Sequence, residues 1–250
     1  MAMFESKTMA PPLRGLLITG TSTGVGKTFV ACGLARALRR RGFSVAPFKP
    51  AETGCNLGKD SQQLVPADAE LLRKATGTDA SPETICPYRF APPVAPWVAA
   101  EQAGITIDPQ HLEHCYQELA ASHDVVLVET AGGILVPLAE KFHYADLARL
   151  LRQPVLVVIG SKLGAINDAR LTLEYLRSAS LAVLACVLNH PSPGQDPAIA
   201  TNEQTLRRLT QIPLFVIPHH PGSPPQQNRV FEPLADRIVQ RLGIMRVPYS

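Results

Sequence analysis

The chain has 250 residues, 46% of them hydrophobic, and a formal net charge of +3, which suits one large globular domain or two small ones. Because this charge is small, nothing favours nucleic-acid binding, and no segment is long and apolar enough to span a membrane. The five cysteines are scattered and contain no C-x-x-C pair. This pattern fits a reducing compartment rather than a structural zinc site, so we expect a cytoplasmic protein.

The first half of the chain alternates apolar runs with amphipathic stretches. Apolar runs predict buried strands, and apolar residues on one helical face predict helices. In chain order, the predicted elements are a strand at 16–18, a helix from Lys27-Thr28 to about Gly42, a strand at 43–48, a loop at 51–66, a helix from about Asp68, an irregular proline-dense segment at 85–96 and a helix at 108–122.

The second half continues this alternation, with four more strands and three more helices. The predicted elements are strands at 124–129, 154–160, 181–189 and 213–218, and helices at 167–179, 201–210 and 231–242. Strands that alternate with helices predict an α/β fold whose mostly parallel sheet is covered by helices on both faces. We expect residues 13–250 to form this single domain and residues 1–12 to be a disordered lead-in.

The stretch from Gly20 to Thr28, GTSTGVGKT, follows the first strand and opens the first helix, as a phosphate-binding loop requires. Backbone N–H groups at such a helix start bind anions, and Gly24 and Gly26 let the backbone approach them. Lys27 can then reach the β- and γ-phosphates, while the Thr28 hydroxyl can bind Mg²⁺. One detail departs from the standard motif, because five residues rather than four separate Gly20 from Gly26. A Gly-rich turn with a solvated lysine is the alternative, and the flanking elements argue against it.

Other candidate side chains lie at the ends of predicted strands or at a helix start. Glu129 precedes a Gly-rich turn, where nucleotide hydrolases place an acidic metal ligand, although a capping carboxylate is an alternative. Lys49 ends the second strand, and its position is equally compatible with a cleft-facing and a solvated lysine. Asp68 is more simply the N-cap of its helix. Asn189 is either a turn residue or an amide that pairs with adenine.

Taken together, these residues resemble the dethiobiotin synthetases of the P-loop NTPase superfamily, from about Gly15 to Pro218. The unusual loop spacing is the family's own. Besides the loop, the stretches that carry the resemblance are Phe48-Lys49-Pro50, Thr53-Gly54, Asp68-Ala69, Val128-Glu129-Thr130-Ala131-Gly132-Gly133, Pro137-Leu138, Ala145-Asp146, Lys162-Leu163-Gly164-Ala165-Ile166-Asn167 and Asn189.

The resemblance implies an ATP- and Mg²⁺-dependent ligase in biotin biosynthesis. It would close the ureido ring of dethiobiotin from 7,8-diaminononanoate and CO₂ or bicarbonate. One amine would capture CO₂ as a carbamate, whose oxygen attacks the γ-phosphorus to give a carbamic–phosphoric anhydride. The second amine would then close the ring and release phosphate.

The resemblance also implies roles for individual residues. ATP would be bound by Thr23, Gly24, Val25, Gly26, Lys27, Thr28, Glu129 and Asn189, the last at the adenine. Mg²⁺ would be held by Thr28, Asp68 and Glu129, and the catalytic residues would be Lys27, Lys49 and Thr53. In the family, a homodimer partner helps to close the substrate site through the stretch that matches Leu163–Asn167.

Two other kinds of protein could share the predicted sheet. One is a partitioning or targeting ATPase switch of the ParA/MinD type, and the other is a different amide-forming ATPase or a kinase for a small carboxylate. Such switches typically begin the loop with Lys-Gly-Gly, whereas Gly20-Thr21-Ser22-Thr23 contains no lysine. Lys49-Pro50 followed by Thr53-Gly54 favours the diamine ligase over the other amide-forming enzymes.

Overall fold

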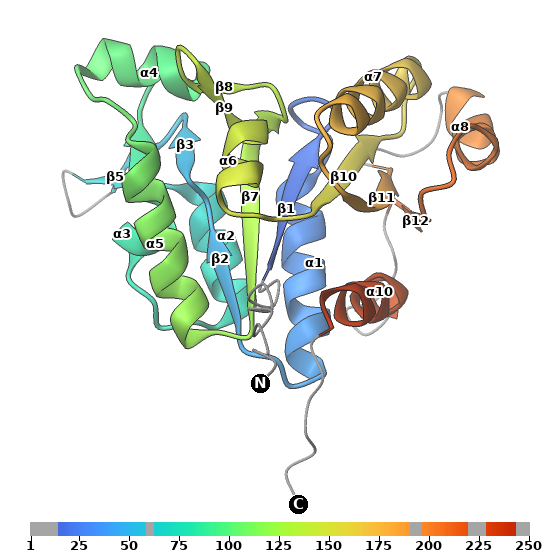
Figure 1. The fold of residues 1–250 in the computed structure, drawn as a ribbon, viewed down its shortest axis with the longest axis horizontal. Coiled ribbons are helices and arrows are strands. Elements are labelled where there is room, and N and C mark those ends of the chain that lie inside the picture. Colours follow the sequence, from blue (N-terminus) through green and yellow to red (C-terminus); the bar gives the residue numbers. More distant parts are fainter. Residues whose placement is uncertain (1–14, 59–62, 191–196, 220–228, 244–250) are drawn as a thin grey trace, which may run out of the picture.

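The computed structural model describes residues 15–58, 63–190, 197–219 and 229–243, so the expected lead-in at 1–12 lies outside the described residues. A six-stranded sheet occupies its centre, and each neighbouring pair of strands is parallel (Figure 1). The strands, in their order across the sheet, are β12 (Leu214–Ile217), β11 (Val183–Asn189), β10 (Val155–Gly160), β1 (Gly15–Gly20), β7 (Val125–Gly133) and β2 (Val45–Phe48).

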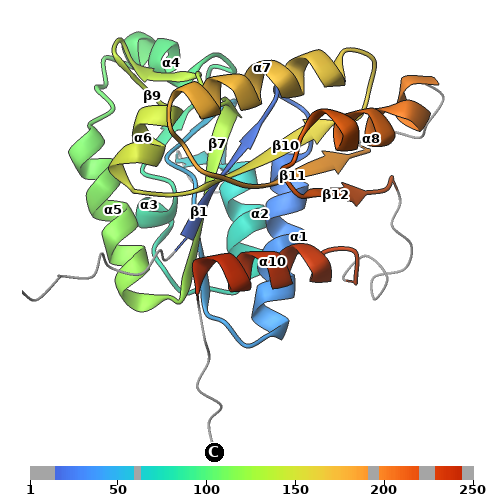
Figure 2. The same cartoon turned by 45° about the vertical axis from the view of Figure 1, so that its right-hand side comes forward.

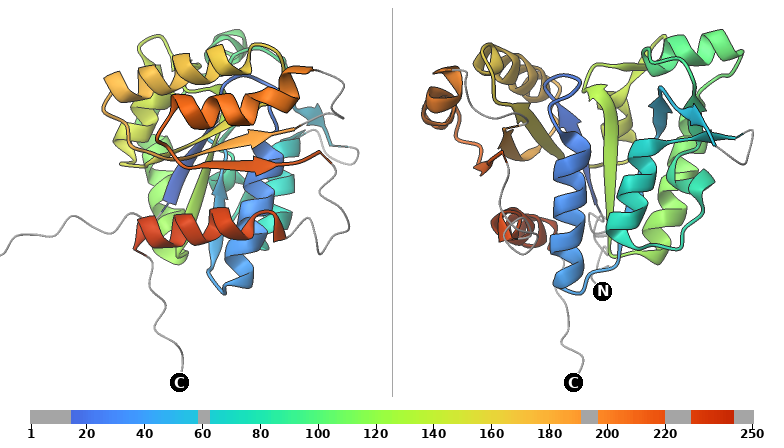
Figure 3. Two further views of the ribbon diagram at one scale, coloured as in Figure 1. Left: turned by 90° about the vertical axis from the view of Figure 1, so that its right-hand side faces the viewer. Right: turned by 180° about the vertical axis from the view of Figure 1, so that it is seen from behind.

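The central strand β1 is buried on both faces. Leu16 and Ile18 point into the core on one side of the sheet, and Leu17 points into the core on the other. One face is covered by α1 (Lys27–Arg40), α2 (Ala67–Thr76) and α10 (Glu232–Leu242). The other face is covered by α5 (Pro109–Ser122), α6 (Tyr144–Leu150), α7 (Ala165–Ser178) and α8 (Pro197–Leu209), and the two layers are visible in Figures 2 and 3. The predicted α/β architecture is therefore confirmed.

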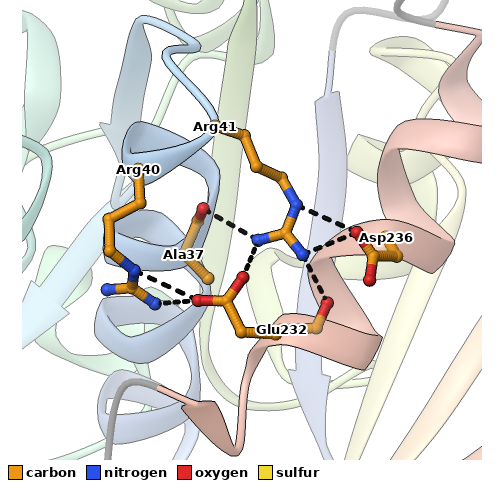
Figure 4. A network of polar contacts seen from close by, with 5 residues as sticks. All are labelled: Ala37, Arg40, Arg41, Glu232 and Asp236. Atoms are coloured by element: carbon orange, nitrogen blue, oxygen red, sulfur yellow. Dashed lines mark hydrogen bonds and ion pairs between the residues drawn. The ribbon is translucent and has the colours of Figure 1, made fainter. Parts of the chain in front are cut away.

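The last helix, α10, is fixed to α1 by both apolar and ionic contacts. Gly33 in α1 makes room for the ring of Phe231, since a Cβ atom at Gly33 would lie 2.2 Å from a ring carbon. At the end of α1, the Arg41 guanidinium pairs with Glu232 and, at 2.6 Å, with Asp236 (Figure 4). The helix predicted at 231–242 thus packs against the helix that follows the phosphate loop.

Several short elements were not predicted from the sequence. The expected loop at 51–66 contains β3 (Ala51–Thr53), β4 (Asn56–Leu57) and β5 (Leu64–Val65), and the expected irregular segment contains β6 (Tyr88–Phe90). The expectation was wrong for β3 and β6 because they pair in parallel with each other, a tertiary contact without a local signal. The short strands β4 and β5 pair antiparallel with each other. The other missed elements are α3 (Pro82–Ile85), α4 (Pro96–Ala103), β8 (Pro137–Ala139), β9 (Phe142–His143) and α6.

Within the described part of the chain, none of the helices combines the length and the apolar character needed to cross a membrane.

Candidate active site

The phosphate loop joins the carboxyl end of β1 to the start of α1. Gly24 and Gly26 have φ angles of 77° and 90°, in the left-handed region that side chains disfavour. Asn189, at the end of β11, is buried and donates its Nδ2 hydrogen to the Val25 carbonyl oxygen at 2.8 Å. A Cβ atom at Gly26 would lie 2.2 Å from this Nδ2 atom. The loop conformation therefore depends on the two glycines and on an amide from β11, two strands away from β1 in the sheet.

Four polar side chains meet beside this loop, from α1, α2, β7 and the residue that follows β2. The Thr28 hydroxyl donates to Oε1 of Glu129 at 2.8 Å, and Lys49 Nζ donates to the same oxygen at 2.6 Å. Lys49 Nζ also lies 3.2 Å from Oδ2 of Asp68. Lys49 is 3% exposed and Glu129 is completely buried, while the Asp68 side chain is 43% exposed. The fold thus brings Lys49 together with the three residues expected to hold a metal.

The interpretation of Asp68 as an N-cap was wrong. The helix α2 begins at Ala67 with Pro66 in the N-cap position, so Asp68 is the second helical residue. Its side chain is consequently free to reach across the helix end toward Lys49.

The two lysines of the site have different electrostatic surroundings. Burial lowers the pKa of Lys49, but the charges of Glu129 and Asp68 and the hydrogen bond to Glu129 outweigh burial and hold this pKa above its ordinary value. The pKa of Lys27 is lowered by burial and then by the charge of Lys49, with Glu129 and Asp68 acting in the opposite direction. Lys27 is therefore a buried cation whose charge is incompletely compensated, and an anionic ligand would stabilise it.

A cavity of about 640 Å³ opens at this edge of the sheet. Eight of the predicted site residues line it, namely Thr23, Gly24, Gly26, Lys27, Thr28, Lys49, Thr53 and Asp68. Glu129 is buried beside the cavity rather than lining it, and Val25 and Asn189 lie behind the loop. A second cavity, of about 650 Å³, lies at the amino ends of β2 and β7 near Arg39 and His123, away from the phosphate loop.

Sequence reasoning missed two parts of the cavity wall. The segment Pro93–Pro96, which leads into α4, lines the cavity and was expected only to be irregular. Glu52 also lines it and is 6% exposed, with both carboxylate oxygens accepting backbone N–H groups of α2. Burial raises the pKa of Glu52, against the lowering effects of these hydrogen bonds and of Lys49. No local sequence pattern identifies Glu52 as a site residue, because the backbone groups that it binds come after β4 and β5 in the sequence.

The parallel sheet, the glycine-rich loop at the end of its central strand and the buried lysine that follows define a P-loop NTPase fold. The family model described as an AAA domain matches residues 14–226. The ATP-dependent dethiobiotin synthetase of Anaeromyxobacter dehalogenans (strain 2CP-C) is 44% identical over 84% of this chain and 92% of that protein. The one from Aquifex aeolicus (strain VF5) is 40% identical, over 81% of this chain and 88% of that protein. The chain belongs to the dethiobiotin synthetase family, which confirms the resemblance found in its motifs.

Solved structures with lower identity share the fold. The septum site-determining protein MinD from Pyrococcus horikoshii, complexed with Mg-ADP, matches with a TM-score of 0.57 and 21% identity, over 92% of this chain and 98% of that chain. A ParA family ATPase from Chlorobium tepidum matches with a TM-score of 0.53 and 14% identity, over 93% and 100% of the two chains. At these identities the likeness shows a common fold and nothing about function.

Proposed function

We propose that this protein closes the ureido ring of dethiobiotin from 7,8-diaminononanoate and CO₂, using ATP and Mg²⁺. The observation that carries this proposal is the cavity in which the phosphate loop faces Lys49 and Thr53. Membership of the dethiobiotin synthetase family supports the same reaction.

The side chains present fit a magnesium ion. Thr28, Asp68 and Glu129 would supply one hydroxyl and two carboxylates, the hard oxygen ligands that Mg²⁺ prefers. Oε2 of Glu129 is buried and has no hydrogen-bond partner among the described residues, so it is available as a ligand. The described residues contain no cluster of three or more His, Cys, Asp or Glu suited to a metal, which leaves nucleotide phosphates and water to complete the coordination. When bound, Mg²⁺ would supply positive charge to the phosphate oxygens.

The protein's own groups then position the reactants and stabilise developing charge. Lys27 would contact the β- and γ-phosphates, and Lys49 would stabilise the charge that builds as the carbamate oxygen approaches the γ-phosphorus. Thr53 would lie against the carbamate. The Asn189 nitrogen already donates to Val25, so its amide oxygen is the atom suited to accept a hydrogen bond from the adenine amino group.

A homodimer would complete the substrate site. Leu163 is 81% exposed and precedes α7, and Leu171 on α7 is 64% exposed. These two exposed leucines, one before α7 and one on it, would be buried if a second copy of the chain packed against this helix. The cysteines Cys32, Cys55, Cys86, Cys115 and Cys186 are free and buried, which suits the cytoplasm that we propose as the protein's location.

The test is ADP release by the purified protein with ATP and Mg²⁺, measured with diaminononanoate and bicarbonate together and with each one omitted. We expect ADP release, and dethiobiotin formation, to require both. Hydrolysis that proceeds equally fast without the diamine would refute the synthetase function and favour an ATPase switch.

A further inference from the structure

Glu52 makes an unusual pair of contacts for a side chain on a short strand. It lies in β3, and its Oε1 atom accepts the backbone N–H of Asp68 at 2.8 Å. Its Oε2 atom accepts the backbone N–H of Ala69 at 3.0 Å. A buried carboxylate on one element therefore binds the first turn of another.

These contacts replace a missing cap. The first N–H groups of a helix have no partner inside the helix, and a side chain at the N-cap usually satisfies one of them. Pro66 occupies the N-cap of α2 and makes no side-chain cap bond with the described residues. Glu52 satisfies two of these groups instead, and its negative charge interacts favourably with the positive end of the helix dipole.

The capped turn carries Asp68 into the active site. The Asp68 carboxylate lies 3.2 Å from Lys49 Nζ, and the same ammonium is 2.6 Å from Glu129. Because the Asp68 side chain is short and partly exposed, the position of its carboxylate follows the position of the helix start. The strand that bears Glu52 is in turn fixed by its parallel pairing with β6.

We propose that Glu52 is a positioning residue for the metal site, acting through the first turn of α2 on Asp68. This inference rests on the proposed function, in which Asp68 is a magnesium ligand. Glu52 contacts two backbone amides rather than the metal, so its effect is to hold a ligand in place.

The main test is Glu52→Gln, which keeps the size of the side chain. A carboxamide has one oxygen, so its NH₂ group would face one of the two backbone N–H donors. We expect the Mg²⁺ concentration for half-maximal activity to rise about tenfold, with the rate largely restored at saturating Mg²⁺. Binding of Mn²⁺, measured by electron paramagnetic resonance with a non-hydrolysable ATP analogue, should weaken by a similar factor.

Glu70→Gln is the matched control. Like Glu52→Gln, it removes one negative charge near the start of α2, because Glu70 lies in the first turn of this helix. The Glu70 carboxylate, however, pairs with Arg73 at 3.2 Å and does not bind the backbone N–H groups of the helix start. Its metal titration should equal that of the wild type. Asp68→Asn serves as the reference for loss of a ligand.

Two results would overturn the inference. The first is that Glu52→Gln has the same Mg²⁺ titration and Mn²⁺ affinity as the wild type, while Asp68→Asn is impaired. This outcome would leave the proposed function standing. The other is rapid hydrogen exchange at the Asp68 and Ala69 amides of the wild-type protein, a measurement that remains possible if Glu52→Gln does not fold. Failure of the proposed function would appear separately, as diamine-independent ADP release by the wild type.

Discussion

Replacement of Lys49 by methionine should destabilise the fold as well as impair catalysis. Methionine retains much of the aliphatic stem but removes the ammonium that pairs with the buried Glu129 at 2.6 Å. Removal of one partner from a buried ion pair costs about 3–5 kcal/mol, because the other charge stays buried without compensation. For a domain of this size, that loss corresponds to a melting temperature lower by roughly 6–20 °C.

Urea denaturation of the nucleotide-free protein measures this cost, and a double-mutant cycle shows its origin. We expect Lys49→Met combined with Glu129→Gln to be more stable than Lys49→Met alone, since the second change removes the uncompensated charge. Lys74→Met is the matched control, because Lys74 is exposed on α2, and its stability should stay within about 0.5 kcal/mol of the wild type.

The same variant tests the catalytic role of Lys49. Bound ATP contains no carbamate, so we expect ATP affinity, measured by calorimetry, to remain near normal and dethiobiotin formation to fall sharply. Wild-type stability of Lys49→Met would refute the buried ion pair. Wild-type activity would refute the catalytic role of Lys49 and leave the synthetase function untouched.

Three further predictions concern other parts of the site and the core. Burial and the charge of Lys49 both lower the pKa of Lys27, so Lys27→Met should not lower the melting temperature of the protein measured without ATP. Added ATP should raise the melting temperature of the wild type but not that of Lys27→Met, and an equal increase in both proteins would contradict this prediction. Glu129→Gln keeps the size of the side chain but removes its charge, so half-maximal activity should require more Mg²⁺, and an unchanged titration would return Glu129 to a structural role. Gly33→Ala would place a Cβ atom 2.2 Å from the ring of Phe231 and should cost about 1–3 kcal/mol in urea denaturation, whereas an unchanged midpoint would show that α10 adjusts easily.

The phosphate loop could be predicted because its signals are contiguous. Strand, glycines and helix follow one another between Leu16 and Thr28, and local geometry fixes what this order can form. Lys49 directly follows β2, and Glu129 lies midway along β7, which continues to Gly133 where a turn was expected. Their convergence at one edge of the parallel sheet follows from the fold class. The parts that sequence analysis located best are those determined by neighbouring residues or by the sheet as a whole.

The segment from Ala51 to Thr53 could not be predicted for the opposite reason. Its strand exists because β6 pairs with it, and Glu52 is informative only when α2 starts beside it. Hydrophobic periodicity predicts neither the β3–β6 pairing nor the contact between Glu52 and α2, and a glutamate in an expected loop indicates a solvated charge. The wrong interpretation of Asp68 has the same origin, because the group that caps α2 comes from another element.

The fold alone does not determine the reaction, since structures of other ATPases at 21% identity or less share this fold. In this chain the short segment after β2 supplies Lys49, Glu52 and Thr53 to one cavity. The Lys49 ammonium pairs with two carboxylates, and it can leave them at low cost only when another cation takes its place. In the proposed reaction, occupation of the metal site would therefore release Lys49 toward the reacting phosphate, so one buried cluster would couple metal binding to catalysis.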